Sequence, residues 1–133
     1  MSMITYRMQD KNRSLEALLD PEQQYSFSMG NQDEDVRHGV SGMASIHELA
    51  AYLAVMAIEA TSPVLVRIEG PLSGDTPCDE AMGEYLTLPT SAEIVADDAD
   101  FFELVSELVD LHWGQGVEFE QLRDIAGERL AYV

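Results

Sequence analysis

A helix start near the middle of the chain constrains the fold most. The segment Ser45-Ile46-His47-Glu48 has the pattern of a capping box, in which a serine hydroxyl and a glutamate carboxylate bond to otherwise free backbone N–H groups. Apolar residues then recur at intervals of three and four, the spacing of one helix face. They are Ile46, Leu49, Ala50, Leu53, Met56, Ala57 and Ala60. We therefore predict a core helix that begins here and ends before Pro63.

Short apolar and β-branched runs on both sides of this helix predict strands. We expect them over residues 3–8, 64–68, 85–88 and 93–96, with the last two forming a meander beside the helix. The polar segment 21–37 is expected to be a loop with a brief strand around residues 25–28. Residues 130–133 are expected to return as an edge strand.

Three further helices are expected. A short one within residues 14–20 stops at Pro21, a long one follows Asp100 and runs to about Trp113, and a last short one is closed by Gly127. With 133 residues and 46% hydrophobic content, the chain can bury one core. The prediction is an α+β fold, a single compact domain over residues 1–133, with a small mixed or antiparallel sheet packed against two main helices and one or two short ones.

The net charge of the chain limits the classes of molecule that it can bind. Seven Lys and Arg stand against 25 Asp and Glu, a net charge of −18. Such a surface repels phosphate backbones and anionic lipids, so we expect no direct binding of nucleic acid or membrane. No run approaches the roughly 20 apolar residues of a membrane span, and the first residues lack an apolar signal core. A cytoplasmic protein is expected.

Several kinds of catalytic site lack their sequence patterns. The glycine-rich loops that cradle nucleotide phosphates are missing. His38, His47 and His112 are too scattered to indicate a zinc site, and Cys78 is the single cysteine. The leading hypothesis therefore includes no metal, no cofactor and no catalytic residue.

The acidic residues are concentrated in one region. Between Ile68 and Leu122 there is no Lys or Arg, although 14 acids lie there. Four of these acids fall at spacings of 3, 4 and 3 on the second long helix, opposite its apolar face: Asp100, Glu103, Glu107 and Asp110. Asp97 and Asp98 precede them at the helix start, where the macrodipole favours negative charge. A row of carboxylates without interleaved cations indicates a basic partner.

This row resembles the surfaces of DNA-mimic inhibitors made by phages and mobile elements, including anti-CRISPR and anti-restriction proteins. The resemblance is one of charge, size and acidic spacing. It implies a non-enzymatic protein that docks on a basic, nucleic-acid-binding protein and inhibits it. The partner-binding residues would be Asp97, Asp98, Asp100, Glu103, Glu107 and Asp110.

An enzymatic alternative stays open. Arg7 on the first strand, Ser41 after Gly39-Val40, and Glu84 at the start of a later strand resemble the Arg, Ser, Glu triad of small ADP-ribosyltransferases. The resemblance implies that Arg and Ser place NAD and that Glu polarises its ribose. It predicts a cleft where the three side chains meet, and a local cluster of Arg7 with Arg37 to offset the acidic field. A third interpretation is that the acidity serves solubility alone.

Overall fold

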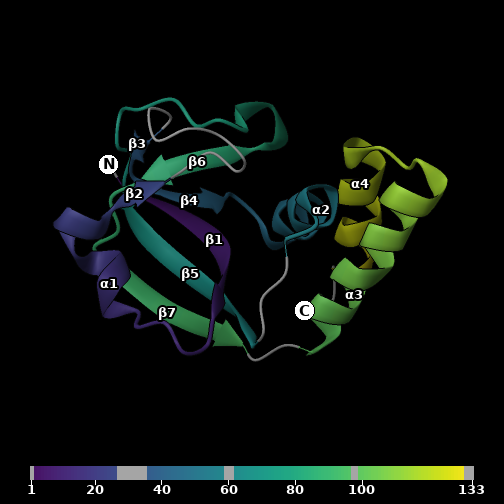
Figure 1. Cartoon of the computed structure of the whole chain (residues 1–133), viewed down its shortest axis with the longest axis horizontal. Helices are drawn as coiled ribbons and strands as arrows, with labels where there is room; N and C mark the ends of the chain where they lie inside the picture. Colours follow the sequence, from purple (N-terminus) through teal and green to yellow (C-terminus); the bar gives the residue numbers. More distant parts are fainter. Residues whose placement is uncertain (1, 27–35, 59–61, 97–98, 131–133) are drawn as a thin grey trace.

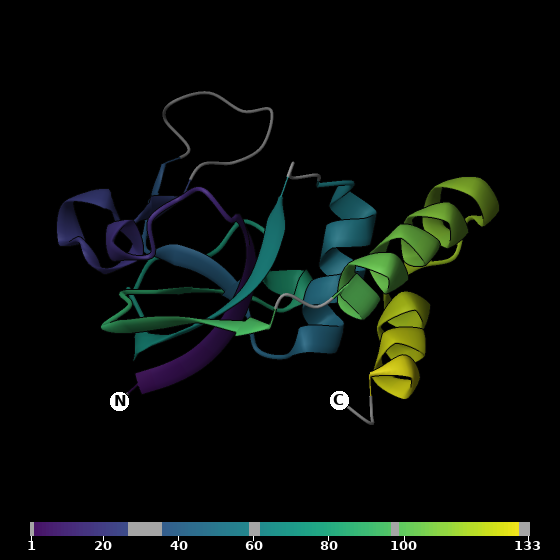
Figure 2. The same cartoon turned by 90° about the horizontal axis from the view of Figure 1, so that it is seen from below.

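The computed structural model describes residues 2–26, 36–58, 62–96 and 99–130, which form a sheet with helices on both sides (Figure 1). The short helix α1 (Glu16–Leu19) packs on one face of the sheet. Helix α2 (Ile46–Met56) packs on the other face, and α3 (Ala99–Val109) and α4 (Phe119–Arg129) lie on the far side of α2 (Figure 2). Helix α2 is thus the central layer, and the expected α+β class is confirmed.

Five antiparallel strands form the main sheet, in the order β6-β4-β1-β5-β7. Their bounds are Ser2–Asp10 for β1, Val40–Met43 for β4, Pro63–Pro71 for β5, Glu84–Thr87 for β6 and Ser91–Ala96 for β7. Strands β1 and β5 pair along their whole length, from Ser2↔Pro71 to Asp10↔Pro63. A separate ribbon pairs β2 (Tyr25–Ser26) with β3 (Arg37–His38).

The central strand β5 supplies side chains to two hydrophobic cores, because successive residues of a strand point to opposite faces. Val66 and its alternate neighbours pack with Leu18 of α1 and Val40 of β4. Leu65 points the other way and joins the larger core that α2, α3 and α4 build. Burial on both faces explains why β5 reads as a continuous apolar run.

The core helix begins where the capping pattern predicts. The Ser45 hydroxyl accepts a hydrogen bond from Glu48 N at 3.2 Å and donates one to the Glu48 carboxylate at 2.9 Å. The helix ends at Met56, because Ala57 adopts a left-handed conformation with φ of 51°. Ala60, which was expected to extend the apolar face, lies outside the described residues. No helix in the described ranges is long and apolar enough to cross a membrane.

The C-terminal helices differ from expectation in length. Helix α3 continues as a wider π-type turn over Asp110–Gly114, so its helical path reaches the predicted end near Trp113. Helix α4 passes through Gly127 and runs to Arg129, so the expectation that Gly127 closes a short helix is wrong. Nothing lies within 4 Å of the place where a Cβ on Gly127 would be, so the helix continues unobstructed. Leu130 forms a turn, and the rest of the expected strand 130–133 lies outside the described residues.

Two short strands, β3 and β4, were not expected from the sequence. Strand β4 contains Gly42, a residue that is unfavourable in strand interiors. A Cβ at this position would lie 2.8 Å from Thr5 Cβ on β1, so glycine permits the close approach of the two strands. In the loop that precedes β3, β2 covers Tyr25–Ser26, and residues 27–35 lie outside the description.

The predicted meander of β6 and β7 is wrong, because these strands occupy opposite edges of the sheet. The sheet curls, and the link between them crosses the end of β5. Leu88 N donates to Pro71 O and Thr90 N donates to Glu69 O, each at 2.8 Å. Gly70 lies directly under this crossing. A three-residue link between two strands suggested a hairpin, but its hydrogen bonds go to β5 instead.

Candidate functional site

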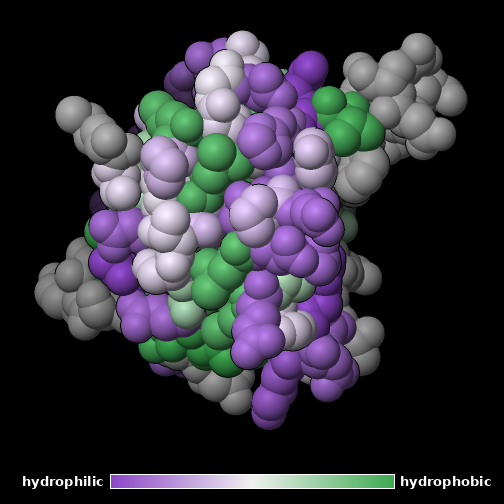
Figure 3. Space-filling view, turned by 90° about the vertical axis from the view of Figure 1, so that its left-hand side faces the viewer, coloured by the Kyte–Doolittle hydropathy of each residue, from purple (hydrophilic) through white to green (hydrophobic). Residues whose placement is uncertain are grey.

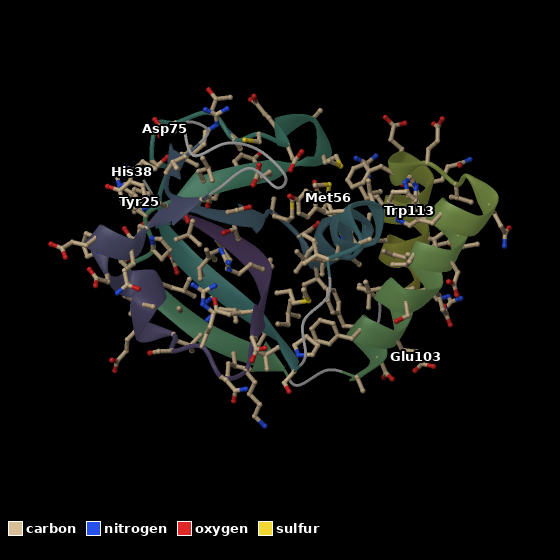
Figure 4. The ribbon with its side chains drawn as sticks, viewed as in Figure 1. Tyr25, His38, Met56, Asp75, Glu103 and Trp113 are labelled. Atoms are coloured by element: carbon tan, nitrogen blue, oxygen red, sulfur yellow. The ribbon has the colours of Figure 1, made fainter. Side chains whose placement is uncertain are left out.

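A cavity of about 830 Å³ opens between β1 and β4. The described residues of these strands pair at Tyr6↔Met43 alone, so the strands diverge beyond that point and leave the cavity between them. Residues of α1 and β2 line one end, and residues of α2 line the other. Tyr25 and Met56, labelled in Figure 4, belong to these two ends. The volume suits a small organic ligand.

The outer face beside α1 offers no comparable apolar surface. Figure 3 shows this face, where hydrophobic residues form separate groups among hydrophilic ones. Leu19 of α1 and Tyr25 of β2 are exposed individually. Isolated apolar side chains are ordinary on protein surfaces. The cavity is therefore the stronger candidate for a binding site in this part of the chain.

Arg7 lies in the wall of the cavity and reaches from β1 to β4. Its Nη1 donates to Ser41 O at 3.0 Å. The residue is partly accessible through the cavity, but its Nε is buried and has no hydrogen-bond partner. Burial lowers the pKa of Arg7 to about 10, and the positive charge of Arg13 adds to the shift. The guanidinium remains protonated at neutral pH.

Glu84 is held at the start of β6 by donors on both of its oxygens. The Ser41 hydroxyl donates to Oε2, and the backbone N of Asp79 donates to Oε1 at 2.8 Å. Asp79 in turn accepts a hydrogen bond from the Tyr52 hydroxyl at 2.8 Å. Burial, followed by this hydrogen bond, raises the pKa of Tyr52 well above its usual range. The network fixes a carboxylate that is only 7% exposed.

Ser41 is positioned by Ser26 of strand β2. The Ser26 hydroxyl donates to Gly39 O at 2.8 Å and accepts from Ser41 N at 3.2 Å. The Ser26 hydroxyl thus bonds to the β4 backbone in place of a β1 backbone group, because β1 diverges from β4 at this point. Arg7, Ser41 and Glu84 come from three strands and all line the cavity. Arg7 contacts the backbone carbonyl of Ser41, whereas Glu84 contacts its hydroxyl.

The two ends of the cavity differ in chemistry. Arg7, Arg13 and Arg37 line the cavity, and so do the acidic residues Glu22, Asp79 and Glu84. The α2 end has the apolar side chains of Leu49, Leu53 and Met56 in its wall, beside Tyr52 and the two carboxylates that it neighbours. Neither Arg13 nor the pair Tyr52 and Asp79 was identified from the sequence. A ligand with an anionic part and an apolar part would match this division.

The acidic row lies on another side of the molecule. Asp100, Glu103, Glu107 and Asp110 are all exposed, and Glu103 in Figure 4 is far from Tyr25 and His38. Glu107 Oε2 accepts from Arg129 Nη1 of α4 at 2.9 Å, so α4 supplies a cation that the helix itself lacks. Asp97 and Asp98 lie outside the described residues.

No protein-family model, curated protein or solved structure matches this chain. Within the described ranges, no group of three or more His, Cys, Asp or Glu side chains is arranged to hold a metal ion. The cavity and the acidic row are therefore the two features of the molecule that indicate a function.

Proposed function

We propose that the protein is a small ADP-ribosyltransferase-like enzyme that binds NAD in the cavity between β1 and β4. One observation carries the proposal: Arg7, Ser41 and Glu84, distant in sequence, all line this cavity, where Arg7 donates to the Ser41 carbonyl and the Ser41 hydroxyl donates to Glu84. The resemblance of these residues to the transferase triad gives each a role. Arg7 and Ser41 place NAD, and Glu84 polarises the nicotinamide ribose.

In this reaction the bond between ribose C1 and the nicotinamide nitrogen breaks, and its electron pair leaves with nicotinamide. A nucleophile, either water or a group on an acceptor, forms a new bond to C1 and loses a proton. Positive charge develops on the ribose during the exchange, and a fixed carboxylate stabilises such charge. Glu84 suits this role because its position is set by Ser41 and Asp79 before any ligand arrives.

The overall charge of −18 opposes an anionic substrate, and the arginines of the cavity answer this objection. Arg7, Arg13 and Arg37 line the cavity beside Glu22, Asp79 and Glu84, so its lining is balanced in charge where the chain as a whole is strongly acidic. Short-range contacts dominate inside a cavity, because charges several Debye lengths away are screened by salt. NAD binding is therefore compatible with the acidic exterior.

The proposal is tested by calorimetric titration with NAD and by assay of nicotinamide release. Glu84→Gln should retain NAD affinity and release nicotinamide at least about 100-fold more slowly, because the charge that stabilises the ribose is lost. Glu120→Gln, an exposed change on α4 with the same effect on net charge, should behave as wild type. A wild-type protein that does not bind NAD would exclude the enzyme.

The acidic row supports a second candidate, docking on a basic, nucleic-acid-binding protein. The observation that favours it is the exposure of four carboxylates along α3 and its final turn, while Phe101, Leu104 and Leu108 are buried in the core. Carboxylates presented by a helix anchored in this way could meet a groove of Lys and Arg without unfolding. The ion pair between Glu107 and Arg129 would have to open or be shared with the partner.

A further inference from the structure

Basic residues are more frequent in the lining of the cavity than in the chain as a whole. Three of the seven basic residues, Arg7, Arg13 and Arg37, belong to this lining. The ion pairs that the described residues form involve other arginines, Arg67 and Arg129. Because the chain has 25 acidic residues, its arginines would be expected to form ion pairs with carboxylates. Arg7, Arg13 and Arg37 form no such pair among the described residues, so their placement in the cavity needs a different reason.

Two of these arginines have buried donors without acceptors. The Nε atoms of Arg7 and Arg37 are buried and make no hydrogen bond. A guanidinium offers five N–H donors, and Arg7 uses Nη1 for the contact with Ser41 O. Buried donors left unsatisfied are destabilising and uncommon in folded proteins. Both side chains line the cavity, so an anionic ligand in it can offset the cost of burying these charges.

Repulsion between the cations points in the same direction. The charge of Arg13 adds to the lowering of the pKa of Arg7 that burial causes, so Arg13 is close enough to disfavour the charged form of Arg7. Arg37 lines the same cavity and is connected to Arg7 through the backbone. It pairs with Ser26 across the β2–β3 ribbon, and Ser26 holds the backbone of Ser41, whose carbonyl binds Arg7. An anion among the three would turn repulsion into attraction.

We propose that Arg7, Arg13 and Arg37 form a subsite for a diphosphate group. Planar guanidiniums bind phosphate oxygens through paired N–H donors, and three cations match a multiply charged group better than a single carboxylate. The inference rests on the proposed function in that it describes the same cavity, with the apolar side chains of the α2 end available for the organic part of a dinucleotide. Arg13 and Arg37 are additions to the triad.

Inorganic pyrophosphate is a suitable probe of the subsite. It has no glycosidic bond, so its binding does not depend on the proposed reaction. Calorimetric titration in metal-free buffer should show binding to the wild-type protein, with inorganic phosphate weaker. Arg37→Met should weaken pyrophosphate binding at least about tenfold, because a charge-assisted contact is lost. Arg67→Met removes the same charge from an exposed pair with Glu93, outside the cavity, and should leave the affinity unchanged.

A structural role for Arg37 makes a different prediction. If Arg37 only supported the fold, Arg37→Met would unfold at a lower temperature without ligand. We expect the unliganded variant to unfold at the same or a higher temperature than wild type, and pyrophosphate to raise the unfolding temperature of wild type more. Absence of pyrophosphate binding, or equal loss in Arg67→Met, would overturn the subsite.

The two proposals fail separately. Pyrophosphate binding by a protein that does not bind NAD would support the subsite and exclude the enzyme. NAD binding that is unchanged in Arg37→Met, by a protein that ignores pyrophosphate, would support the enzyme and overturn the subsite.

Discussion

Gly70 permits the crossing that places β6 and β7 at opposite edges of the sheet, and alanine at this position should destabilise the protein strongly. A Cβ on residue 70 would overlap Leu88 O and lie 2.7 Å from Leu88 C and 2.8 Å from Pro89 Cα. Non-bonded carbon atoms normally keep about 3.5–4.0 Å apart. All three neighbours are backbone atoms, so the link itself must move by about 1 Å.

The cost follows from this displacement. Overpacking of a rigid site costs about 1–3 kcal/mol. The shift also weakens the hydrogen bonds from Leu88 N to Pro71 O and from Thr90 N to Glu69 O, each worth about 1 kcal/mol. Alanine restricts the unfolded chain and returns about 0.5 kcal/mol. We expect Gly70→Ala to lower the free energy of unfolding by about 3 kcal/mol and the unfolding temperature by roughly 10 °C.

Gly127→Ala is the matched control, because it is the same substitution with open space around the new methyl group. Within α4 it should stabilise the protein by about 0.5–1 kcal/mol. Urea denaturation followed by circular dichroism measures both variants. If the free energy of unfolding of Gly70→Ala lies within about 0.5 kcal/mol of the wild-type value, the size of a typical surface effect, the link after β6 does not cross β5 closely.

Two further predictions concern the Tyr52 hydroxyl and the acidic row. Tyr52 has a raised pKa, so its stabilising contribution is complete below the ordinary tyrosine value of 10.0 and declines as the pH rises above it. The difference in unfolding free energy between wild type and Tyr52→Phe should therefore shrink above pH 10.0, and a constant difference would contradict the buried hydrogen bond. Changing Asp100, Glu103, Glu107 and Asp110 to Asn or Gln should weaken binding to a basic partner, measured across a salt series, and leave the fold intact. A control variant in which the exposed Glu16, Glu80, Asp124 and Glu128 are neutralised in the same way should bind the partner nearly as well as wild type. If both variants lose the same affinity, the partner responds to net charge and not to the pattern of the acidic row.

Local signals in the sequence were sufficient where one segment determines its own structure. The cap at Ser45 predicted the start of α2, and the β-branched run 64–68 predicted the interior strand β5. Both depend on hydrogen bonds or burial patterns that lie within a few residues. The signal failed at Gly127, because a glycine in a helix is permitted at modest cost and does not by itself end it.

Pairing between distant segments was less predictable. Strand β4 has four residues, one of them Gly42, and becomes a strand because β1 and β6 lie beside it. The link after β6 resembled a hairpin turn, yet the curl of the sheet gives its backbone donors acceptors on β5. Such competition between pairings is decided by the whole sheet, which no short window contains.

The candidate site shows the same division. Arg7, Ser41 and Glu84 could be identified because their residue types and order resemble a known triad, but the cavity that all three line depends on the gap between β1 and β4. Tyr52 and Asp79 had no signal, since a tyrosine on a helix and an aspartate in a loop are ordinary residues.

Net charge was informative about the surface and misleading about the interior. The value of −18 describes the mean field, which an approaching partner meets at long range. The cavity, in contrast, is lined by Arg7, Arg13 and Arg37, which come from β1, the turn after it and β3, as well as by the acidic Glu22, Asp79 and Glu84. The positions of the three arginines in the sequence are 6 and 24 residues apart, so no basic run marks them. An acidic chain can therefore repel polyanions with its surface and still hold a small anion in a pocket, because contact distance decides which charges dominate.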